Sequence, residues 1–235
     1  YPGKGMFAKP FRVLHQVSLE IAPGETLGLV GESGSGKTTI GRAVLGLAPV
    51  TEGRITFAGQ DISHATRRDR RGLSKDLQVV FQDPYTSLNP SLTVGDILSE
   101  PLGIQGITGP DARKRVQELL DRVHMPQDAM RRLPREFSGG QRQRIAIARA
   151  LALRPKLIVC DEPVSALDLS TQARVLDLLL EIQQGTGVSY LFVSHDLSVV
   201  RHVSHRVAVL YKGEIVEQGE ALQVTEAPVH PYTQK

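Results

Sequence analysis

One glycine-rich segment limits the folds open to this chain more than any other feature. Residues 31–38 read Gly-Glu-Ser-Gly-Ser-Gly-Lys-Thr, directly after the apolar run Thr26–Val30 and directly before a helical pattern over residues 39–47. Glycines leave backbone N–H groups accessible in such a loop, and the helix that follows adds the positive end of its dipole. Lys37 supplies a cation and Thr38 a hydroxyl suited to Mg²⁺. The segment therefore predicts a loop that binds nucleotide phosphates.

Two adjacent carboxylates follow another apolar run of the chain. The run Leu157–Cys160 ends directly before Asp161 and Glu162. Such a run predicts a buried strand, and open α/β sheets bind ligands at the carboxyl ends of their strands. Asp161 is suited to hold Mg²⁺ through its water shell, and Glu162 to orient or deprotonate a water that attacks the γ-phosphate. Cys160 is interpreted as a small buried hydrophobic residue without a redox role.

Short strand-like runs alternate with helical patterns in the first half and the last third of the chain. The expected strands cover residues 17–21, 26–30, 54–58, 77–81, 156–160, 188–193 and 206–211, and the expected helices cover 111–124, 141–153 and 170–184. We expect an α/β protein with a P-loop NTPase core, an inserted α-helical subdomain and an N-terminal antiparallel β region. Its single domain divides into a core of residues 1–90 and 155–235 and a helical part of residues 91–154.

Composition limits which binding partners and which cellular compartment are expected for this chain. The 28 Lys and Arg against 25 Asp and Glu give a net charge of +3, which does not favour nucleic acid as a partner. The basic run Arg67–Arg71 is interpreted as a solvated face. No apolar stretch approaches the ~20 residues of a membrane-spanning helix. A lone cysteine and the lack of a leader favour a cytosolic protein, and the lack of an initiator Met is expected of a segment cut from a longer chain.

A third motif lies between the loop and the two carboxylates. Residues Phe137–Gln141 read Phe-Ser-Gly-Gly-Gln, with Ser138 as a suitable N-cap for the helix that follows. In this order, the three motifs resemble those of ATP-binding cassette (ABC) ATPases, although the family usually has Leu where this chain has Phe137. The resemblance covers nearly the whole chain and implies an ATPase that uses ATP and Mg²⁺.

The resemblance also assigns roles to polar residues that follow other strands. Gln82 resembles the glutamine that reaches Mg²⁺ and the attacking water, and His195, within Ser194–Asp196, resembles the histidine that contacts the γ-phosphate. Ser165–Asp168 resembles the loop that contacts the opposite subunit of a dimer. For the residue that stacks on adenine, the resemblance favours Tyr1 over Phe7.

The expected site combines catalytic, metal-binding and nucleotide-binding residues. The expected catalytic residues are Glu162, His195 and Gln82. The expected Mg²⁺ ligands are Thr38, Gln82 and Asp161. The residues expected to contact ATP are Tyr1, Gly31, Ser33, Gly34, Ser35, Gly36, Lys37, Thr38 and Thr39, together with Ser138, Gly139, Gly140 and Gln141, which complete the site of a partner molecule.

Two further segments resemble one branch of the family. Gln82–Pro90 reads Gln-Asp-Pro-Tyr-Thr-Ser-Leu-Asn-Pro and His230–Thr233 reads His-Pro-Tyr-Thr, as in oligopeptide and dipeptide importers and their nickel and glutathione relatives. The resemblance implies a peripheral protein on the cytoplasmic face of the membrane that powers the import of peptides or similar small solutes. Its implied partners are a second ABC ATPase domain, identical or homologous, and permease subunits that dock near residues 93–101, with an extracytoplasmic solute-binding protein acting indirectly.

Three alternative functions stay open. They are an ABC ATPase that acts on DNA or ribosomes, an accessory subunit of a phosphonate-degrading complex, and a nucleotide-binding regulator without turnover. The absence of a long coiled-coil or charged insertion disfavours the first, and the presence of Glu162 and His195 disfavours the third. The transported solute is not encoded in motifs of this kind.

Overall fold

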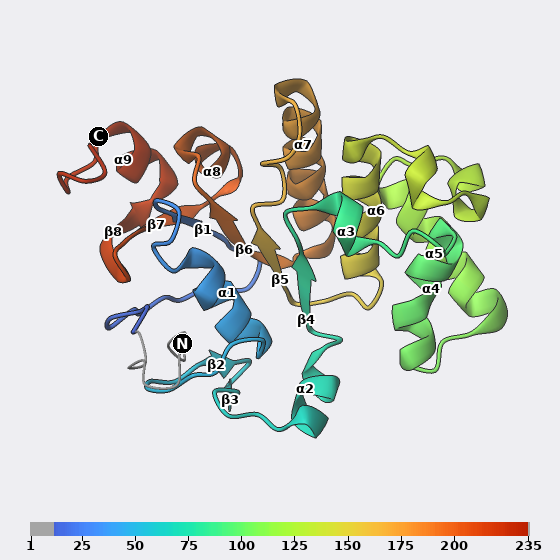
Figure 1. Cartoon of the computed structure of the whole chain (residues 1–235), viewed down its shortest axis with the longest axis horizontal. Helices are drawn as coiled ribbons and strands as arrows, with labels where there is room; N and C mark the ends of the chain where they lie inside the picture. Colours follow the sequence, from blue (N-terminus) through green and yellow to red (C-terminus); the bar gives the residue numbers. More distant parts are fainter. Residues whose placement is uncertain (1–11, 235) are drawn as a thin grey trace, which may run out of the picture.

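A computed structural model describes residues 12–234, and a six-stranded sheet lies at its centre (Figure 1). The strand order is β4-β5-β6-β1-β7-β8. The strands are β1 (Thr26–Val30), β4 (Leu77–Val80), β5 (Leu157–Asp161), β6 (Ser189–Ser194), β7 (Arg206–Tyr211) and β8 (Glu214–Glu220). The first five in the spatial order are parallel, and β8 pairs antiparallel with β7. All five parallel strands therefore end at the same edge of the sheet.

Helices cover both faces of this sheet, which explains its nearly continuous apolar strands. Along β6, Leu191 and Val193 pack in the apolar cluster that includes Ile40 of α1 (Lys37–Leu45). The intervening Tyr190 and Phe192 pack in the second, larger cluster, with residues of the helices on the opposite face. The two clusters give the sheet a core on each side.

The remaining helices follow in chain order. They are α2 (Arg67–Leu73), α3 (Pro84–Ser87), α4 (Val94–Ile104), α5 (Gly109–Arg122), α6 (Gly139–Leu151), α7 (Leu169–Thr186), α8 (Leu197–Val203) and α9 (Ala221–Glu226), with the 3₁₀ turns η1 (Gln127–Arg131) and η2 (Pro134–Glu136). Helices α4, α5 and α6 pack against one another beside β4, at the right of Figure 1. The predicted helices 111–124, 141–153 and 170–184 correspond to α5, α6 and α7, with ends within two residues.

The predicted α/β fold is confirmed, but the predicted strand over residues 17–21 is wrong. This segment carries no strand, although Val17, Leu19 and Ile21 are half-buried and alternate with exposed residues as the pattern predicts. Their side chains pack against the cluster on the α1 side of the sheet. The period-two pattern therefore indicated burial correctly, but burial does not supply the backbone hydrogen-bonding partner that defines a strand.

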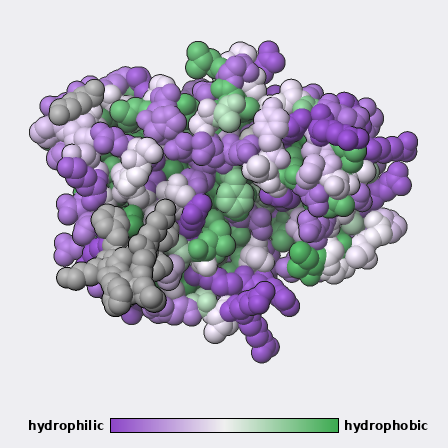
Figure 2. Space-filling model, viewed as in Figure 1, coloured by the Kyte–Doolittle hydropathy of each residue, from purple (hydrophilic) through white to green (hydrophobic). Residues whose placement is uncertain are grey.

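The predicted strand over residues 54–58 is also much shorter than expected. Only β2 (Thr56–Phe57) forms, and it pairs antiparallel with β3 (Gln60–Asp61). The basic run 67–71 lies in α2, where no residue is buried, as a solvated face requires. Figure 2 shows hydrophilic residues over this region at the bottom of the molecule. Arg70 differs from the other basic residues of the run, because its guanidinium donates to the carbonyls of Val44 and Ile62.

The N-terminus of α7 offers a prediction about pH and stability. Asp168 is its N-cap: its carboxylate accepts hydrogen bonds from Ser170 Oγ (2.7 Å) and from the Thr171 N–H (3.0 Å), and these bonds lower its pKa to about 2. Because the pKa of Asp168 is lower in the folded state than in the unfolded state, the ionised carboxylate stabilises the fold. This stabilisation is fully present at pH values above the unfolded-state pKa of ~3.9 and is lost as pH falls through about 2. Asp168→Ala should therefore lower the Tm at neutral pH and lose this difference near pH ~2.

Asp168→Asn is the matched control for this prediction, because asparagine is also a good N-cap but does not titrate. The measurement is thermal unfolding followed by circular dichroism across the acidic range. We expect the Tm difference between the Asn and Ala variants to be the same at every pH, because neither side chain titrates, and only wild type to lose stability relative to both as pH falls through about 2. A Tm deficit of Asp168→Ala that is the same at both ends of the pH range would contradict the assignment.

Candidate functional site

The sheet order brings the predicted site segments to one edge of the molecule. Strands β4, β5, β6 and β1 are neighbours in the sheet, so their ends lie next to one another. The loop 31–36 follows β1, the carboxylates Asp161 and Glu162 lie at the end of β5, and His195 follows β6. Gln82 follows β4 at the same edge. This is the edge at which open α/β sheets bind ligands.

Two glycines shape the loop between β1 and α1. Gly36 is the N-cap of α1 with φ of 112°, and a Cβ there would lie 2.7 Å from Leu14 Cδ2. Gly34 has φ of 83°, and a Cβ there would meet no atom within 4 Å. Gly36 is thus required by both conformation and packing, whereas Gly34 borders open space. That bare backbone surface is where a phosphate group can approach N–H groups.

Lys37 is buried at the start of α1, with 4% of its surface exposed. Its Nζ donates to the carbonyls of Gly31 (2.7 Å) and Glu32 (2.9 Å), so the loop curves around the ammonium group. Burial lowers the pKa of Lys37, and the nearby carboxylates of Glu162 and Asp161 partly offset this effect. The arrangement places a partly desolvated cation inside the loop, where its attraction for anions is strengthened.

Thr38 and Asp161 join the loop to the end of β5. Thr38 Oγ1 donates to Asp161 Oδ1 at 3.1 Å. Burial raises the pKa of Asp161, the hydrogen bond from Thr38 opposes this shift, and repulsion from Glu162 adds to it. A nearby divalent cation would favour the ionised form of this carboxylate. A hydroxyl and a carboxylate are also the hard oxygen donors that Mg²⁺ prefers.

Glu162 and His195 form the second pair at this edge. Glu162 Oε2 lies 3.2 Å from His195 Nδ1, and the Glu162 N–H donates to the carbonyl of Val193 at 3.0 Å. Glu162 has φ of 50°, a left-handed conformation that is uncommon for residues other than glycine. Ser165 Oγ donates to the Glu162 carbonyl at 3.1 Å. Glu162 and Asp161 therefore have different side-chain partners, His195 for the first and Thr38 for the second.

The segment that carries Gln82 is bonded to α6 rather than to the loop. The side chain of Gln143 donates to the carbonyl of Phe81 at 3.4 Å, and Arg149 Nη1 donates to the carbonyl of Ser87 at 2.6 Å. The guanidinium of Arg142 also lies 4.2 Å from the centre of the Tyr85 ring. Gln82 itself is exposed at the end of β4. Its surroundings therefore link the sheet edge to α6.

The motif at residues 137–141 forms the N-cap and the first turn of α6. Ser138 and Gln141 make a reciprocal capping box: Ser138 Oγ accepts from the Gln141 N–H (3.3 Å), and Gln141 Oε1 accepts from the Ser138 N–H (3.0 Å). Gly140 permits close packing, because a Cβ there would lie 2.2 Å from Thr171 Cγ2. Within residues 12–234, no hydrogen bond joins the motif to the loop. Figure 1 shows β4 and β5 between α1 and α6.

The loop fits an anionic group in one further respect. The hydroxyl of Ser35 is buried and has no hydrogen-bonding partner in the described part of the chain. A buried hydroxyl without a partner is costly unless a ligand satisfies it. Together with the open space at Gly34 and the buried charge of Lys37, it makes the loop chemically suited to the phosphates of a nucleotide.

The remaining predicted site residues take simpler positions. Ser33 is exposed in the loop and Thr39 is half-buried in the first turn of α1. The two candidates for adenine stacking, Tyr1 and Phe7, lie outside the described residues. Sequence reasoning gave no role to Tyr232, whose hydroxyl accepts a hydrogen bond from the Glu32 N–H at 3.1 Å. Its only signal was the motif at residues 230–233.

Comparison with known proteins defines the family of this chain. The family model described as ABC transporter matches residues 14–165. The chain belongs to this family, as its motifs predict. A solved structure of cbiO1 from Clostridium perfringens, described as part of the ABC transporter complex cbiONQ, is 28% identical and covers 92% of this chain and 85% of its own, with a TM-score of 0.83.

A second solved structure and the curated relatives refine this assignment. The dimeric ATP-binding cassette MJ0796, bound to ADP and Pi, is 31% identical with a TM-score of 0.78 and covers 89% of this chain and 90% of its own. The glutathione import ATP-binding protein GsiA of Salmonella paratyphi A and that of Escherichia coli K12 are each 52% identical over 98% of this chain. The predicted resemblance to the oligopeptide and dipeptide importers and their glutathione relatives is thus confirmed. The chain spans 38% of the length of these relatives.

Proposed function

We propose that this chain is the ATP-hydrolysing cassette of an ABC importer for glutathione, peptides or similar small solutes. The observation that carries the proposal is the joint position of buried Lys37, the Thr38–Asp161 pair and the Glu162–His195 pair at one sheet edge. Each pair matches one requirement of phosphoryl transfer to water. The names of the relatives, which are import ATP-binding proteins, support import over an action on DNA or ribosomes.

In this proposal, each residue of the site has a separate role in ATP hydrolysis. N–H groups of residues 33–39 and the ammonium of Lys37 bind and orient the phosphates of ATP. Thr38, Asp161 and Gln82 hold Mg²⁺, which when bound neutralises charge on the β- and γ-phosphates. Glu162 accepts the proton of the attacking water. His195 lies against Glu162 and orients it.

A second cassette completes each nucleotide site in this proposal. The first turn of α6, capped by Ser138 and Gln141, has N–H groups and a positive dipole end that would contact the nucleotide held by the loop of the other cassette. The dimeric state of the MJ0796 cassette supports this arrangement. The core of residues 1–90 and 155–235 then carries one half of each site, and the helical part of residues 91–154 carries the other half.

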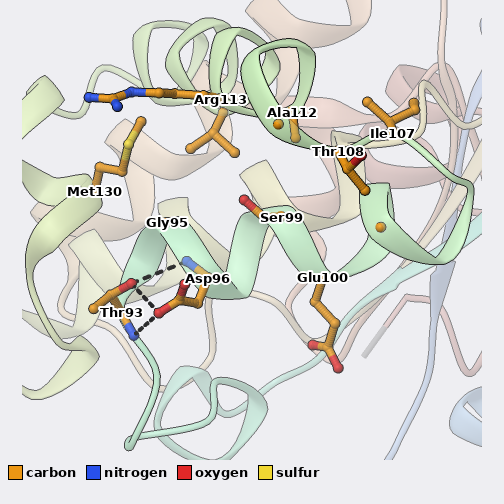
Figure 3. A pocket seen from close by; sticks show the side chains of 13 residues that line it. Thr93, Gly95, Asp96, Ser99, Glu100, Ile107, Thr108, Ala112, Arg113 and Met130 are labelled. Atoms are coloured by element: carbon orange, nitrogen blue, oxygen red, sulfur yellow. Dashed lines mark hydrogen bonds between the residues drawn. The ribbon is translucent and has the colours of Figure 1, made fainter.

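The membrane subunits dock on the helical part. A groove of about 520 Å³ lies between α4 and α5, and Figure 3 shows Ser99 of α4 and Arg113 of α5 among the side chains around it. The groove includes much of the predicted docking segment 93–101, which follows Gln82 and α3 in the chain. None of the helices in residues 12–234 combines the length and the apolar character needed to cross a bilayer. We place the chain at the cytoplasmic face of the membrane, bound to permease subunits.

A matched pair of glycine substitutions tests this docking surface. Gly103 of α4 lines the groove, and Gly72 of α2 lies away from it; a Cβ at either position would meet no atom within 4 Å. Gly103→Trp should fill the groove and lower co-purification with permease subunits from detergent-solubilised membranes by at least about tenfold, because docking requires shape complementarity. Gly72→Trp should co-purify as wild type does, and both variants should bind MgATP normally.

The same preparations test the function as a whole. Wild-type complexes should release phosphate from MgATP and should accumulate a glutathione- or peptide-like solute in vesicles. Equal recovery of permease subunits with both tryptophan variants would reject the groove as the docking site. ATP turnover without any associated membrane subunit would reject the role in import.

A further inference from the structure

We propose that Tyr232 is a positioning residue for the phosphate-binding loop, and that it acts through the peptide group between Gly31 and Glu32. The proposal rests on the proposed function, because the orientation of this peptide matters only if the loop binds a nucleotide. It also gives a role to the motif at residues 230–233, which the catalytic assignment does not use.

The geometry of a single peptide group carries the inference. Its N–H, from Glu32, donates to Tyr232 Oη at 3.1 Å, and its carbonyl, from Gly31, accepts from Lys37 Nζ at 2.7 Å. A trans peptide is planar, so its N–H and carbonyl point in opposite directions and rotate together. Tyr232 therefore fixes, from outside the loop, the orientation of a carbonyl that holds the Lys37 ammonium.

The next carbonyl along the chain extends this effect into the loop. The Glu32 carbonyl accepts from Lys37 Nζ at 2.9 Å and from the Ser35 N–H at 3.2 Å. The second of these bonds closes a turn over residues 32–35, which contains Gly34 and its open backbone surface. A rotation of the Gly31–Glu32 peptide would thus disturb both the position of the cation and the turn that presents N–H groups.

Tyr232 is itself well anchored. Its ring packs on that of Tyr211 at the end of β7, with centroids 4.3 Å apart and planes inclined by 33°. The carboxylate of Glu217 on β8 accepts from the N–H groups of Val229 (2.8 Å) and His230 (3.1 Å), and the Tyr232 N–H donates to His230 Nδ1 at 3.2 Å. The hydroxyl therefore lies at the end of a segment fixed to the sheet, and not on a free side chain.

Tyr232→Phe tests the proposal, because it removes the hydroxyl and keeps the ring that packs on Tyr211. A hydrogen bond of this type has a modest net effect, so we expect the Kd for MgATP to rise about fivefold and kcat at saturating MgATP to stay within about twofold of wild type. In steady-state kinetics, the loss of affinity should therefore raise KM and not lower kcat, because Tyr232 does not contact the reacting atoms. Calorimetry with MgATP and phosphate-release kinetics give the two quantities.

Tyr211→Phe is the matched control. It removes a hydroxyl from the other ring of the same pair, and that hydroxyl has no hydrogen bond within the described residues. We expect a wild-type Kd for this variant. If wild type binds MgATP and both Phe variants bind it equally well, the proposal is wrong, even if Tyr232→Phe lowers the Tm. If wild type does not bind MgATP at all, the proposed function fails instead.

Discussion

Glu162→Gln is expected to bind MgATP as tightly as wild type and to hydrolyse it at least about 100-fold more slowly. General-base assistance accounts for effects of this size. Glutamine matches glutamate in shape and can still form a hydrogen bond at the position of the 3.2 Å contact with His195, but it cannot accept the proton of a water. Phosphate release measures the loss of turnover, and equilibrium binding measures the retained affinity.

Glu214→Gln provides the control for charge. Glu214 is an exposed carboxylate on β8, which is the edge strand at the opposite end of the sheet from β4. We expect wild-type turnover from this variant.

Because Glu162→Gln retains ATP, it should also accumulate as an ATP-dependent dimer, and adding Ser138→Arg should abolish that dimer by blocking the α6 terminus. Turnover of Glu162→Gln at the wild-type rate would remove Glu162 from the catalytic role. Loss of turnover without a dimer at any protein concentration would indicate pairing with an unlike cassette.

Lys37→Ala should lower the affinity for MgATP by at least about 100-fold. The substitution removes a buried cation and leaves the carbonyls of Gly31 and Glu32 without their shared donor, so the loop loses both its charge and part of its shape. Calorimetry with MgATP measures the change in Kd.

Lys156→Ala is the matched control for this prediction. Lys156 is exposed, pairs with Asp76 and directly precedes β5, so it lies at the opposite end of that strand from Asp161. Its removal changes the net charge equally and should leave the Kd unchanged. Equal affinity of wild type and Lys37→Ala would show that the loop is not the phosphate-binding element.

Those parts of the site whose chemistry restricts the residue types were predictable from sequence. A loop that brings phosphates to bare backbone needs glycines at Gly34 and Gly36, and an apolar strand that ends in Asp161 and Glu162 places acids at a ligand edge. The capping box of Ser138 and Gln141 is similarly local, since both partners lie within one helical turn. In each case the physical requirement acts over a few neighbouring residues.

The remaining features depend on contacts between distant parts of the chain. Residues 17–21 have the pattern of a strand, but only pairing with another segment could have made them one. The order β4-β5-β6-β1 is set by packing and not by any local run, and it determines which strand ends meet. Tyr232 contacts Glu32 across 200 positions of sequence, so no periodicity could indicate that hydrogen bond.

The most direct measurement is a crystal structure of Glu162→Gln grown with millimolar MgATP. We expect electron density for the triphosphate along residues 31–39, with Mg²⁺ beside Thr38 and Asp161, and with Ser138–Gln141 of a second cassette against the γ-phosphate. Nucleotide bound elsewhere, or no nucleotide at saturating MgATP, would contradict the assignment of this sheet edge as the ATP site.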